Sequence, residues 1–538
     1  MTGPVAGPTP DPAPAPTLAS YDAIPYESFA LPETHPDHLG AIGALLGIDA
    51  APVDGCRVLE LGSAAGGNLI PMAFQLPGSD FVGVELSAQQ AGRGQALIGE
   101  LGLGNCRLLH QDILGLNPDP AGGLGSFDYI LVHGVYSWVP EPVREHILRL
   151  CGGLLAAHGI AYVSYNVAPG WRSRGMLRDM LLHHCREAHS PAERLAKARQ
   201  LLDLLAAGLA GDGRPEAEVL RRELEYLQGA RASYLYHEYL EEVNAPETFS
   251  DFMARARGHG LRYLADARLH TLFPTSLNPA AQSVLDRFET QSEMEQYMDF
   301  FTLRPFRRSL LVRVGAEPNL DIDLGRLLGF SLYGDLEPAE TAVMDRALPQ
   351  SYRTAGGGAF HLEHPLTKAL VERLAAVYPN ARPLPDLLEE SRRLVGRCGG
   401  EARSQETRAC LSEVFSLYCS GGLGLSRRAA AWPARVSARP CATPLARAQA
   451  AAGEGHAATA RHRVLALDPL SAHLLGLLDG TRDRASLIRG LMGQLRGQPD
   501  LAPDLMARCQ DPGELETAVA ENLERLLCLF ARNGLLQS

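Results

Sequence analysis

Short, mostly apolar runs recur through the first part of the chain, and a longer polar or amphipathic stretch separates each run from the next. Runs of this length that are rich in Val, Leu and Ile are typical of strands buried on both faces. Because such strands alternate here with helical segments, the pattern predicts a parallel sheet wrapped by helices on both sides. The expected strands cover residues 57–61, 80–85, 106–111, 127–132 and 160–165.

Helix signals occupy the stretches between and after these runs. The sequence Thr34-His-Pro-Asp37 resembles a capping box, which satisfies the first free N–H groups of a helix. Pro142 suits the first turn of another helix, and Gly159 suits its end. Beyond Trp171 the pattern becomes amphipathic over long stretches, which predicts helices that bury one face. The expected helices cover residues 34–46, 142–157, 175–210 and 215–228.

The first predicted strand runs into a glycine-rich turn that opens a helix, Gly62-Ser-Ala-Ala-Gly-Gly-Asn68. Glycines let such a turn tighten and let its backbone approach a ligand, because they carry no Cβ. The second strand ends in Glu85, at about the 20-residue interval after Gly62 that is typical of a ribose-binding acid. The arrangement predicts a nucleoside site, but the glycine pattern alone serves NAD, FAD and S-adenosylmethionine alike.

Two further acids favour S-adenosylmethionine. Glu60 lies inside the first strand, where an unpaired carboxylate is costly, and the ammonium group of this cofactor would supply a partner. Asp112 follows the third strand, in position to accept a hydrogen bond from an adenine amine. The alternatives are local: Glu60 could pair with Arg57. Glu85 could instead cap a helix, and Asp112 could be an ordinary loop acid.

These residues resemble the class I S-adenosylmethionine-dependent methyltransferases. The segment 127–140, Phe-Asp-Tyr-Ile-Leu-Val-His-Gly-Val-Tyr-Ser-Trp-Val-Pro, is similar to the fourth strand and following loop of bacterial members that carry a methyltransferase regulatory domain. Segments 21–26, 234–244 and 296–301 are similar to the N-terminal signature and the regulatory part of that family. It includes the rickettsial protein lysine methyltransferases, which modify outer-membrane proteins. The resemblance therefore implies methyl transfer to a protein side chain, with lysine as the acceptor.

The resemblance implies an α/β fold, with a doubly wound, mostly parallel, seven-stranded Rossmann-like sheet that ends in an antiparallel pair. Runs at 260–265 and 309–314 are expected to complete this sheet, which makes the preceding helices an insertion. Further on, Pro365-Leu and its following leucines recur at Pro469-Leu; two related helical modules of winged-helix type would explain this, and so would chance. The expected parts are a disordered leader (1–20), a cofactor-binding core (21–170), a helical insertion (171–245), a regulatory segment (246–320) and a mostly helical C-terminal region (325–538).

One position departs from the family pattern. The usual motif has a second glycine two residues after the first, and this chain has Ala64 there. Its methyl group narrows the approach to the cofactor without removing the helix N-terminus, so binding is expected to survive.

Candidate site residues lie at the carboxyl edge of the sheet, where ligands of such folds bind. Aromatic residues after the fourth strand would form an apolar slot that lowers the pKa of a lysine acceptor, about 10.4 when free. Each aromatic could instead be a packing anchor. His133 is either a general base or a contact to the cofactor. The candidate catalytic residues are His133, Tyr136, Trp138, Tyr165 and Asn166. The candidate cofactor-binding residues are Tyr26, Glu60, Gly62, Ser63, Gly66, Asn68, Glu85, Leu86, Gln111, Asp112, Ile113 and His133.

Composition narrows the class of protein. A net charge of −12 argues against duplex nucleic acid as a partner, because phosphate contacts need clustered basic residues. The 10 cysteines contain no C-x-x-C pair, which is typical of reduced thiols in a cytoplasmic protein and gives no metal site. Residues 1–20 lack the basic start and apolar run of a signal peptide, and no apolar stretch reaches the ~18 residues that span a bilayer. Neither export nor membrane insertion is expected.

The sequence therefore predicts a cytoplasmic methyltransferase that uses S-adenosyl-L-methionine, releases S-adenosyl-L-homocysteine and acts on a protein substrate. The inserted helices are candidates for a homodimer contact. Two other functions stay open: a small-molecule N- or O-methyltransferase, and a non-catalytic protein that senses the cofactor. The long C-terminal region favours a macromolecular substrate, because small acceptors seldom need so much additional chain.

Overall fold

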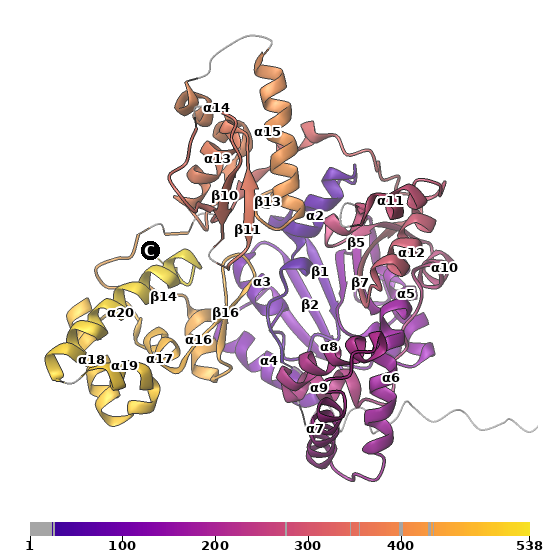
Figure 1. The fold of residues 1–538 in the computed structure, drawn as a ribbon, viewed down its shortest axis with the longest axis horizontal. Coiled ribbons are helices and arrows are strands. Elements are labelled where there is room, and N and C mark those ends of the chain that lie inside the picture. Colours follow the sequence, from indigo (N-terminus) through magenta and orange to yellow (C-terminus); the bar gives the residue numbers. More distant parts are fainter. Residues whose placement is uncertain are drawn as a thin grey trace, which may run out of the picture.

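The computed structural model describes residues 24, 27–274, 277–344, 346–354, 356–396, 402–428, 432–433, 435–509 and 511–537. A seven-stranded sheet forms the centre of the molecule, and the chain after residue 325 adds two smaller lobes beside it (Figure 1). The predicted leader and Tyr26 lie outside the described residues.

The central sheet has the strand order β3-β2-β1-β4-β5-β7-β6, and its neighbours are parallel except where β7 pairs with β5 and β6. The strand order reverses between β1 and β4, so ligands of such a sheet bind outside the carboxyl ends of these two strands. This arrangement confirms the predicted fold class. The strands are β1 (Arg57–Leu61), β2 (Asp80–Glu85), β3 (Cys106–His110), β4 (Phe127–Val132), β5 (Leu155–Asn166), β6 (Leu261–Asp266) and β7 (Phe306–Arg313).

The predicted strands all occur, and the predicted antiparallel end of the sheet is confirmed. The start of the fifth strand differs from the prediction. Helix α5 (Glu141–Leu154) ends before the predicted residue 157, because Leu155 already pairs with Phe127 of β4. A register irregularity then follows on β4, and the extended segment that results carries Gly159 inside the strand rather than at the end of a helix.

The helix that precedes the sheet, α2 (Pro36–Leu45), has a different cap from the predicted one. His35 is its N-cap, and the ring Nδ1 of His35 accepts a hydrogen bond from the backbone N–H of Asp37. Thr34 is engaged elsewhere, because its hydroxyl accepts from the side-chain amide of Asn68. The capping-box interpretation of 34–37 was therefore wrong, although the helix is present.

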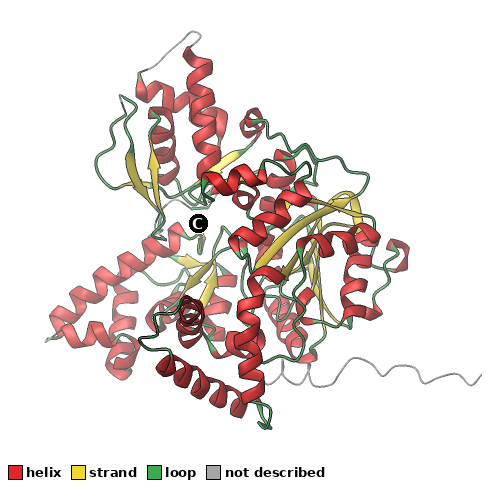
Figure 2. Cartoon of the chain, turned by 45° about the vertical axis from the view of Figure 1, so that its right-hand side comes forward, coloured by secondary structure: helices red, strands yellow, loops and turns green. Residues whose placement is uncertain are grey.

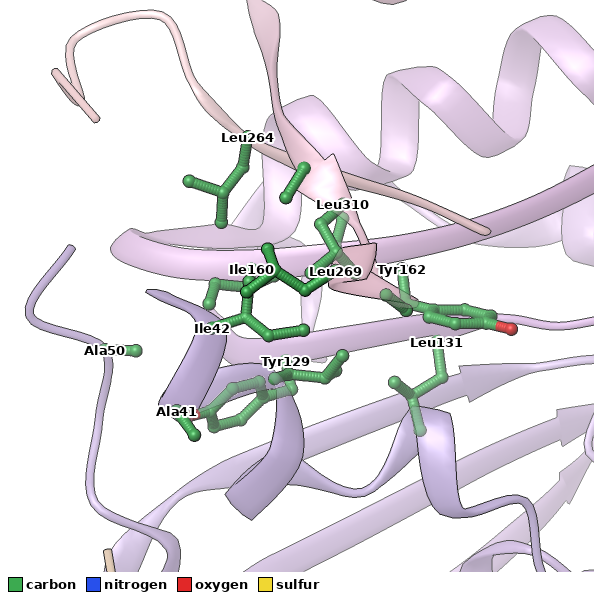
Figure 3. Close-up of a cluster of buried hydrophobic side chains, with 14 of the residues drawn as sticks. Ala41, Ile42, Ala50, Tyr129, Leu131, Ile160, Tyr162, Leu264, Leu269 and Leu310 are labelled. Carbon is green, nitrogen blue, oxygen red and sulfur yellow. The ribbon is translucent and has the colours of Figure 1, made fainter. Parts of the chain in front are cut away.

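Helix α2 lies close to the sheet because glycines occupy its inner face. A Cβ at Gly40 would lie 2.8 Å from the Tyr129 hydroxyl, and a Cβ at Gly43 would lie 2.8 Å from Cδ1 of Ile160. Figure 3 shows the apolar cluster beneath this helix. Besides Tyr129 and Ile160, it contains Ala41, Ile42, Ala50, Leu131, Tyr162, Leu264, Leu269 and Leu310.

Helices cover both faces of the sheet (Figure 2). A fully buried arginine ties one of them to the sheet: Arg307 of β7 donates to Asp299 and to Glu295 at 2.8 Å. Buried charges are tolerated only when they are paired in this way. The helix that Arg307 ties to the sheet is α12 (Gln291–Thr302). The other helices around the sheet include α3 (Leu69–Gln75), α4 (Ala88–Glu100), α10 (Phe249–Gly258) and α11 (Pro279–Leu285).

The helical insertion between β5 and β6 forms a separate apolar cluster at one end of the molecule (Figure 1). The single helix predicted over 175–210 was wrong, because the chain breaks between two helices there. Ser190 caps the second of them by accepting from the N–H of Glu193, and Pro191 occupies its first turn. The inserted helices are α6 (Ala168–His184), α7 (Pro191–Gly208), α8 (Pro215–Gly229) and α9 (Ala232–Tyr239).

The chain after residue 325 forms two lobes, which we name the middle lobe (325–428) and the C-terminal lobe (435–537). Apolar side chains of the middle lobe join the core of the sheet, whereas the C-terminal lobe has a core of its own. The middle lobe contains β8 (Ser331–Tyr333), β9 (Glu337–Pro338), β10 (Gln350–Arg353), β11 (Ala359–Leu362), α13 (Pro365–Ala375), β12 (Arg382–Pro383), α14 (Leu384–Val395), α15 (Ala402–Cys419) and β13 (Gly424–Ser426). The C-terminal lobe contains β14 (Cys441–Ala442), α16 (Pro444–Ala452), β15 (His456–Ala458), β16 (Val464–Ala466), α17 (Pro469–Leu477), α18 (Arg484–Gly497), α19 (Pro503–Arg508), α20 (Pro512–Arg532) and β17 (Leu536–Gln537).

Candidate functional site

The glycine turn after β1 lies at the point where the strand order reverses. The N–H groups of Gly62 and Ser63 donate to the carbonyl of Val84 on β2, at 2.8 and 3.1 Å. Gly62 has a φ of +75°, and a Cβ there would lie 2.4 Å from Val135 in the loop after β4. Only glycine fits both the backbone conformation and the contact. The turn therefore brings the loop after β4 against the carboxyl end of β1.

Glu60 is a buried acid with an incomplete set of partners. Its side chain is on β1, the residue is 3% exposed, and Oε1 accepts from Nδ2 of Asn68 at 2.7 Å. Oε2 has no hydrogen-bond partner among the described residues. Burial raises the pKa of Glu60 to about 7; the Asn68 bond opposes this rise, and the charge of Glu85 adds to it. Arg57 bonds Asp80 instead, so pairing between Glu60 and Arg57 is excluded as its explanation.

Glu85 ends β2 beside the glycine turn. Its carboxylate accepts from the N–H of Ala64 and from the N–H of Ser87, both at 2.8 Å. These two bonds orient the carboxylate, and a carboxylate accepts more than two hydrogen bonds. Ala64, at the position where the family pattern has glycine, adopts a left-handed φ of +48°, which is unfavourable for a residue with a Cβ. Its bond to Glu85 holds it there.

The predicted adenine side of the site lies at the ends of β2 and β3. Leu86 is 47% exposed there, and Ile113 is half-buried against the core. Asp112 is exposed and accepts from the N–H of Leu114 at 2.9 Å, so it also caps a short turn. Gln111 is exposed as well and donates to Gly115. An exposed apolar surface beside an acid suits a flat, amine-bearing base.

An N-terminal strap, residues 27–34, crosses the glycine turn. The hydroxyl of Ser28 accepts from the N–H of Gly67 at 2.7 Å, and the N–H of Leu31 donates to Oδ1 of Asn68 at 3.0 Å. Thr34 contacts the same side chain from the end of the strap. Asn68 therefore links the strap to Glu60.

The strap depends on the lack of a side chain at Gly67. A Cβ there would lie 2.2 Å from the backbone oxygen of Ser28, so Gly67→Ala is expected to displace the strap and to cost about 1–3 kcal/mol of unfolding free energy. Thermal unfolding measures the loss of stability, and limited proteolysis within 27–34 measures the displacement of the strap. Gly99→Ala is the matched control, because no atom lies within 4 Å of a Cβ at that position of α4. Equal stability and equal cleavage in both variants would contradict the contact.

His133 follows β4 and is half-buried. Its Nδ1 lies 2.9 Å from the hydroxyl of Tyr162, and its ring meets Phe306 of β7 edge-on. Burial, assisted by the charge of Arg308, lowers the pKa of His133 to about 4. A neutral imidazole with so low a pKa is a poor acceptor for the proton of an ammonium group, so of its two predicted roles the contact to the cofactor fits the geometry better.

The aromatic candidate catalytic residues are packed against the regulatory segment and the helical insertion. Tyr165 stacks on Phe252 of α10, with ring centroids 4.0 Å apart, and Tyr136 meets the same ring edge-on. The hydroxyl of Tyr136 is buried without a partner among the described residues. Trp138 packs edge-on against Trp171. All three rings pack against other aromatic rings, and Tyr136 in addition keeps a buried hydroxyl without a partner among the described residues.

Asn166 lies at the end of β5, and a residue that sequence reasoning missed holds it there. Its Nδ2 donates to Oδ1 of Asn244 at 3.0 Å, and its backbone N–H donates to Ser137. Asn244 ends a segment noted for its family resemblance, but nothing in its spacing indicates that it returns to β5. The pair places two carboxamides beside the loop after β4.

Family models match three parts of the chain: a methyltransferase domain over 59–161, a predicted methyltransferase regulatory domain over 231–313, and a PKMT C-terminal winged helix domain over 438–535. An uncharacterized protein, RP028 of Rickettsia prowazekii, is 35% identical over 238 residues, which are 44% of this chain and 94% of that protein. The chain belongs to the S-adenosylmethionine-dependent methyltransferases with a regulatory domain.

Two further relatives extend the comparison for this methyltransferase. The uncharacterized protein RP789 of Rickettsia prowazekii is 39% identical over 318 residues, which are 59% of this chain and only 57% of that protein. The solved structure of PKMT2 from Rickettsia typhi is 26% identical, with a TM-score of 0.83 over 95% of this chain and all of that chain. The similarity to PKMT2 thus extends through the middle and C-terminal lobes of the methyltransferase.

Proposed function

We propose that this chain transfers the methyl group of S-adenosylmethionine to a protein side-chain amine, with lysine as the acceptor. The observation that carries the proposal is the buried Glu60–Asn68 pair beneath the glycine turn, with the oriented carboxylate of Glu85 on the next strand. The likeness to PKMT2 along nearly the whole chain supports a macromolecular acceptor. A structure of PKMT2 has also been solved with AdoHcy.

Each acid on these strand ends has a defined part in holding the methyl donor. Glu60, ionised and with Oε2 unpaired among the described residues, would receive the ammonium group of the methionine end. Glu85 would accept from the two ribose hydroxyls, and Asp112 from the adenine amine. Gly62, Ser63 and Gly66 would let the backbone approach the donor, and Tyr26 would close over it. Leu86, Gln111, Ile113 and His133 would complete the lining.

The bound donor supplies an electrophilic methyl group, and the acceptor nitrogen displaces a sulfide in line. Little net charge forms in this step, so positioning and the exclusion of water supply most of the rate. The acceptor must first lose a proton, and an apolar aromatic slot favours its neutral form. Tyr136 and Trp138 would form this slot, while Tyr165 and Asn166 would position the amine. Asn244 joins them through its bond to Asn166.

Tyr136 offers a test in which the fold stays intact. Its hydroxyl is buried and unpaired among the described residues, so Tyr136→Phe is expected to lower kcat about tenfold without lowering stability. Tyr352→Phe is the matched control, because that hydroxyl is also buried without a described partner but lies in the middle lobe. Turnover numbers and thermal midpoints of both variants are measured. Unchanged turnover for Tyr136→Phe would make this ring a packing residue only.

The nature of the acceptor is tested by incubating the chain with methyl-tritiated S-adenosylmethionine and a whole-cell lysate. The proposal expects label in a protein band, recovered after hydrolysis as methylated lysine. Label confined to the small-molecule fraction would favour the alternative of a small acceptor. Absence of label in both fractions, with the donor still bound, would favour a cofactor-sensing protein.

We also propose that the inserted helices join two copies of the chain. Apolar side chains are exposed along three of them, namely Met176 of α6, Leu204 of α7, and Val219 and Tyr226 of α8. Light scattering is expected to give the mass of a dimer, and Leu204→Glu with Tyr226→Glu to give that of a monomer. A monomeric unmodified chain would refute this arrangement.

None of the described helices combines the length and the apolar composition that a membrane-spanning segment needs.

A further inference from the structure

The C-terminal lobe reaches the methyl-donor site through one hairpin. Strands β15 and β16 form a wing whose tip, residues 459–463, lies against the end of α3, as Figure 1 shows for β16. The carbonyl of Thr459 accepts from Nε2 of Gln75 at 3.0 Å, and His456 meets Phe29 of the strap edge-on. At the base of the wing, just before β15, Glu454 pairs with Arg93 of α4 at 3.3 Å. The wing therefore docks on the cofactor-binding core along several contacts.

The tip inserts one side chain into the polar network beneath the glycine turn. His462 is 1% exposed, and its Nε2 lies 2.8 Å from Oδ1 of Asn68, a residue 394 positions earlier in the chain. His462 has a φ of +51°, which is unusual for a residue with a Cβ. Backbone strain of this kind persists only where the surroundings enforce it. The tip holds it through bonds from His462 N–H to Thr459 and from Ala460 N–H to Asn533 at the end of α20.

The direction of the bond between His462 and Asn68 follows from the other partners of the amide. The N–H of Leu31 can only donate, so the atom that it meets is Oδ1 of Asn68. The other end, Nδ2, then faces the carboxylate of Glu60 and the hydroxyl of Thr34. His462 must therefore donate from Nε2, which leaves its Nδ1 as an acceptor with no partner among the described residues.

Protonation of His462 is disfavoured, and the bond does not require it, because the neutral ring already donates from Nε2. Burial lowers the pKa of His462 well below its usual range, and the neighbouring ring of His35, with its centroid 5.2 Å away, acts in the same direction. Arg461 and Arg463 flank it on the tip; Arg461 is turned away toward Pro379 and the ring of Tyr333. A neutral imidazole with its proton on Nε2 is thus the form that the site selects.

We propose that His462 is a positioning residue for the methyl donor: by donating to Asn68 Oδ1, the wing of the C-terminal lobe keeps Asn68 Nδ2 directed at Glu60, and so orients the carboxylate that receives the donor's amino-acid end. This inference rests on the proposed function of the Glu60 site. It makes the C-terminal lobe a part of the cofactor site, rather than only a surface for the substrate.

The test compares two ligands of the full chain by calorimetry. S-adenosylhomocysteine has the amino-acid end, whereas 5′-methylthioadenosine keeps the nucleoside and thioether but lacks that end. His462→Gly removes the ring and suits the left-handed backbone. This variant is expected to lower the affinity for S-adenosylhomocysteine about tenfold and to keep the affinity for 5′-methylthioadenosine within about twofold of that of the unmodified chain. His462→Gln, which retains a donor at a similar reach, is expected to restore the affinity to within about threefold of the unmodified chain.

Val464→Ala is the matched control on the same wing, because Val464 is 44% exposed; it is expected to bind both ligands as the unmodified chain does. Unchanged S-adenosylhomocysteine affinity in His462→Gly would overturn the proposal. Equal weakening of both ligands would also overturn it, since it would show that the wing supports only the fold. If the unmodified chain binds neither ligand, the proposed cofactor site itself fails, and the positioning role fails with it.

Discussion

Replacing Glu85 with alanine is expected to weaken S-adenosylhomocysteine binding about a hundredfold, the largest effect anticipated for a single side chain in this site. The proposed ligand would direct two ribose hydroxyls at this carboxylate, and hydrogen bonds to a charged group contribute about 1.5–3 kcal/mol each. Because 5′-methylthioadenosine carries the same hydroxyls, the affinity for this ligand is expected to fall by a similar factor. Calorimetric titration of both ligands measures the change.

The control for this substitution comes from the other end of the same strand. Asp80 begins β2 and pairs with Arg57 at a partly exposed position, so Asp80→Ala removes a carboxylate without touching the site. It is expected to retain both affinities. Glu85→Ala also deprives the N–H groups of Ala64 and Ser87 of their acceptor, so thermal midpoints of both variants are compared. If a folded Glu85→Ala variant binds both ligands with unaltered affinity, the ribose does not bind at this strand end.

Glu60→Gln is expected to lower the affinity for S-adenosylhomocysteine about thirtyfold at about pH 8, because the ammonium group of the ligand would lose a charged acceptor. In the unmodified chain the same affinity is expected to fall as the pH drops. Burial raises the pKa of Glu60 to about 7, so the ionised form that would receive the ammonium group becomes scarce below that pH. Binding at about pH 6 is expected to be roughly tenfold weaker than at about pH 8.

The stability of the unliganded chain is expected to change in the opposite sense. A carboxyl group with a pKa raised from 4.5 to about 7 in the folded chain destabilises the fold progressively as the pH rises through that range. Glu60→Gln is therefore expected to raise the thermal midpoint at about pH 8 while it lowers ligand affinity. A pH-independent affinity in the unmodified chain, or the same pH dependence for 5′-methylthioadenosine, would contradict the role given to Glu60.

The central sheet could be predicted from the sequence because its strands are buried on both faces. Runs such as 127–132 are mostly apolar, and their order along the chain leaves few ways to connect them. Local polar signals were less reliable. The capping-box pattern at 34–37 failed because Thr34 bonds Asn68 in the folded chain, and a helix predicted over 175–210 failed because Ser190 and Pro191 start a new one.

The acids proposed to hold the cofactor could be placed at one edge of the sheet from the sequence, because the topology of a parallel sheet brings the carboxyl ends of its strands together. The partners of the amide side chains in the candidate site could not be predicted in the same way. Asn244 and His462 reach Asn166 and Asn68 from 78 and 394 positions away, through an insertion and a separate lobe. Nothing local at His462 distinguishes it from an ordinary hairpin residue, since its left-handed φ becomes visible only in the folded wing.

A crystal structure of the chain with S-adenosylhomocysteine tests the central claim most directly. The account predicts both ribose hydroxyls within hydrogen-bonding distance of the Glu85 carboxylate, and the ligand's ammonium group against Oε2 of Glu60 beside Asn68. A nucleoside bound away from the ends of β1 and β2, or one whose amino-acid end points away from Glu60, would contradict it.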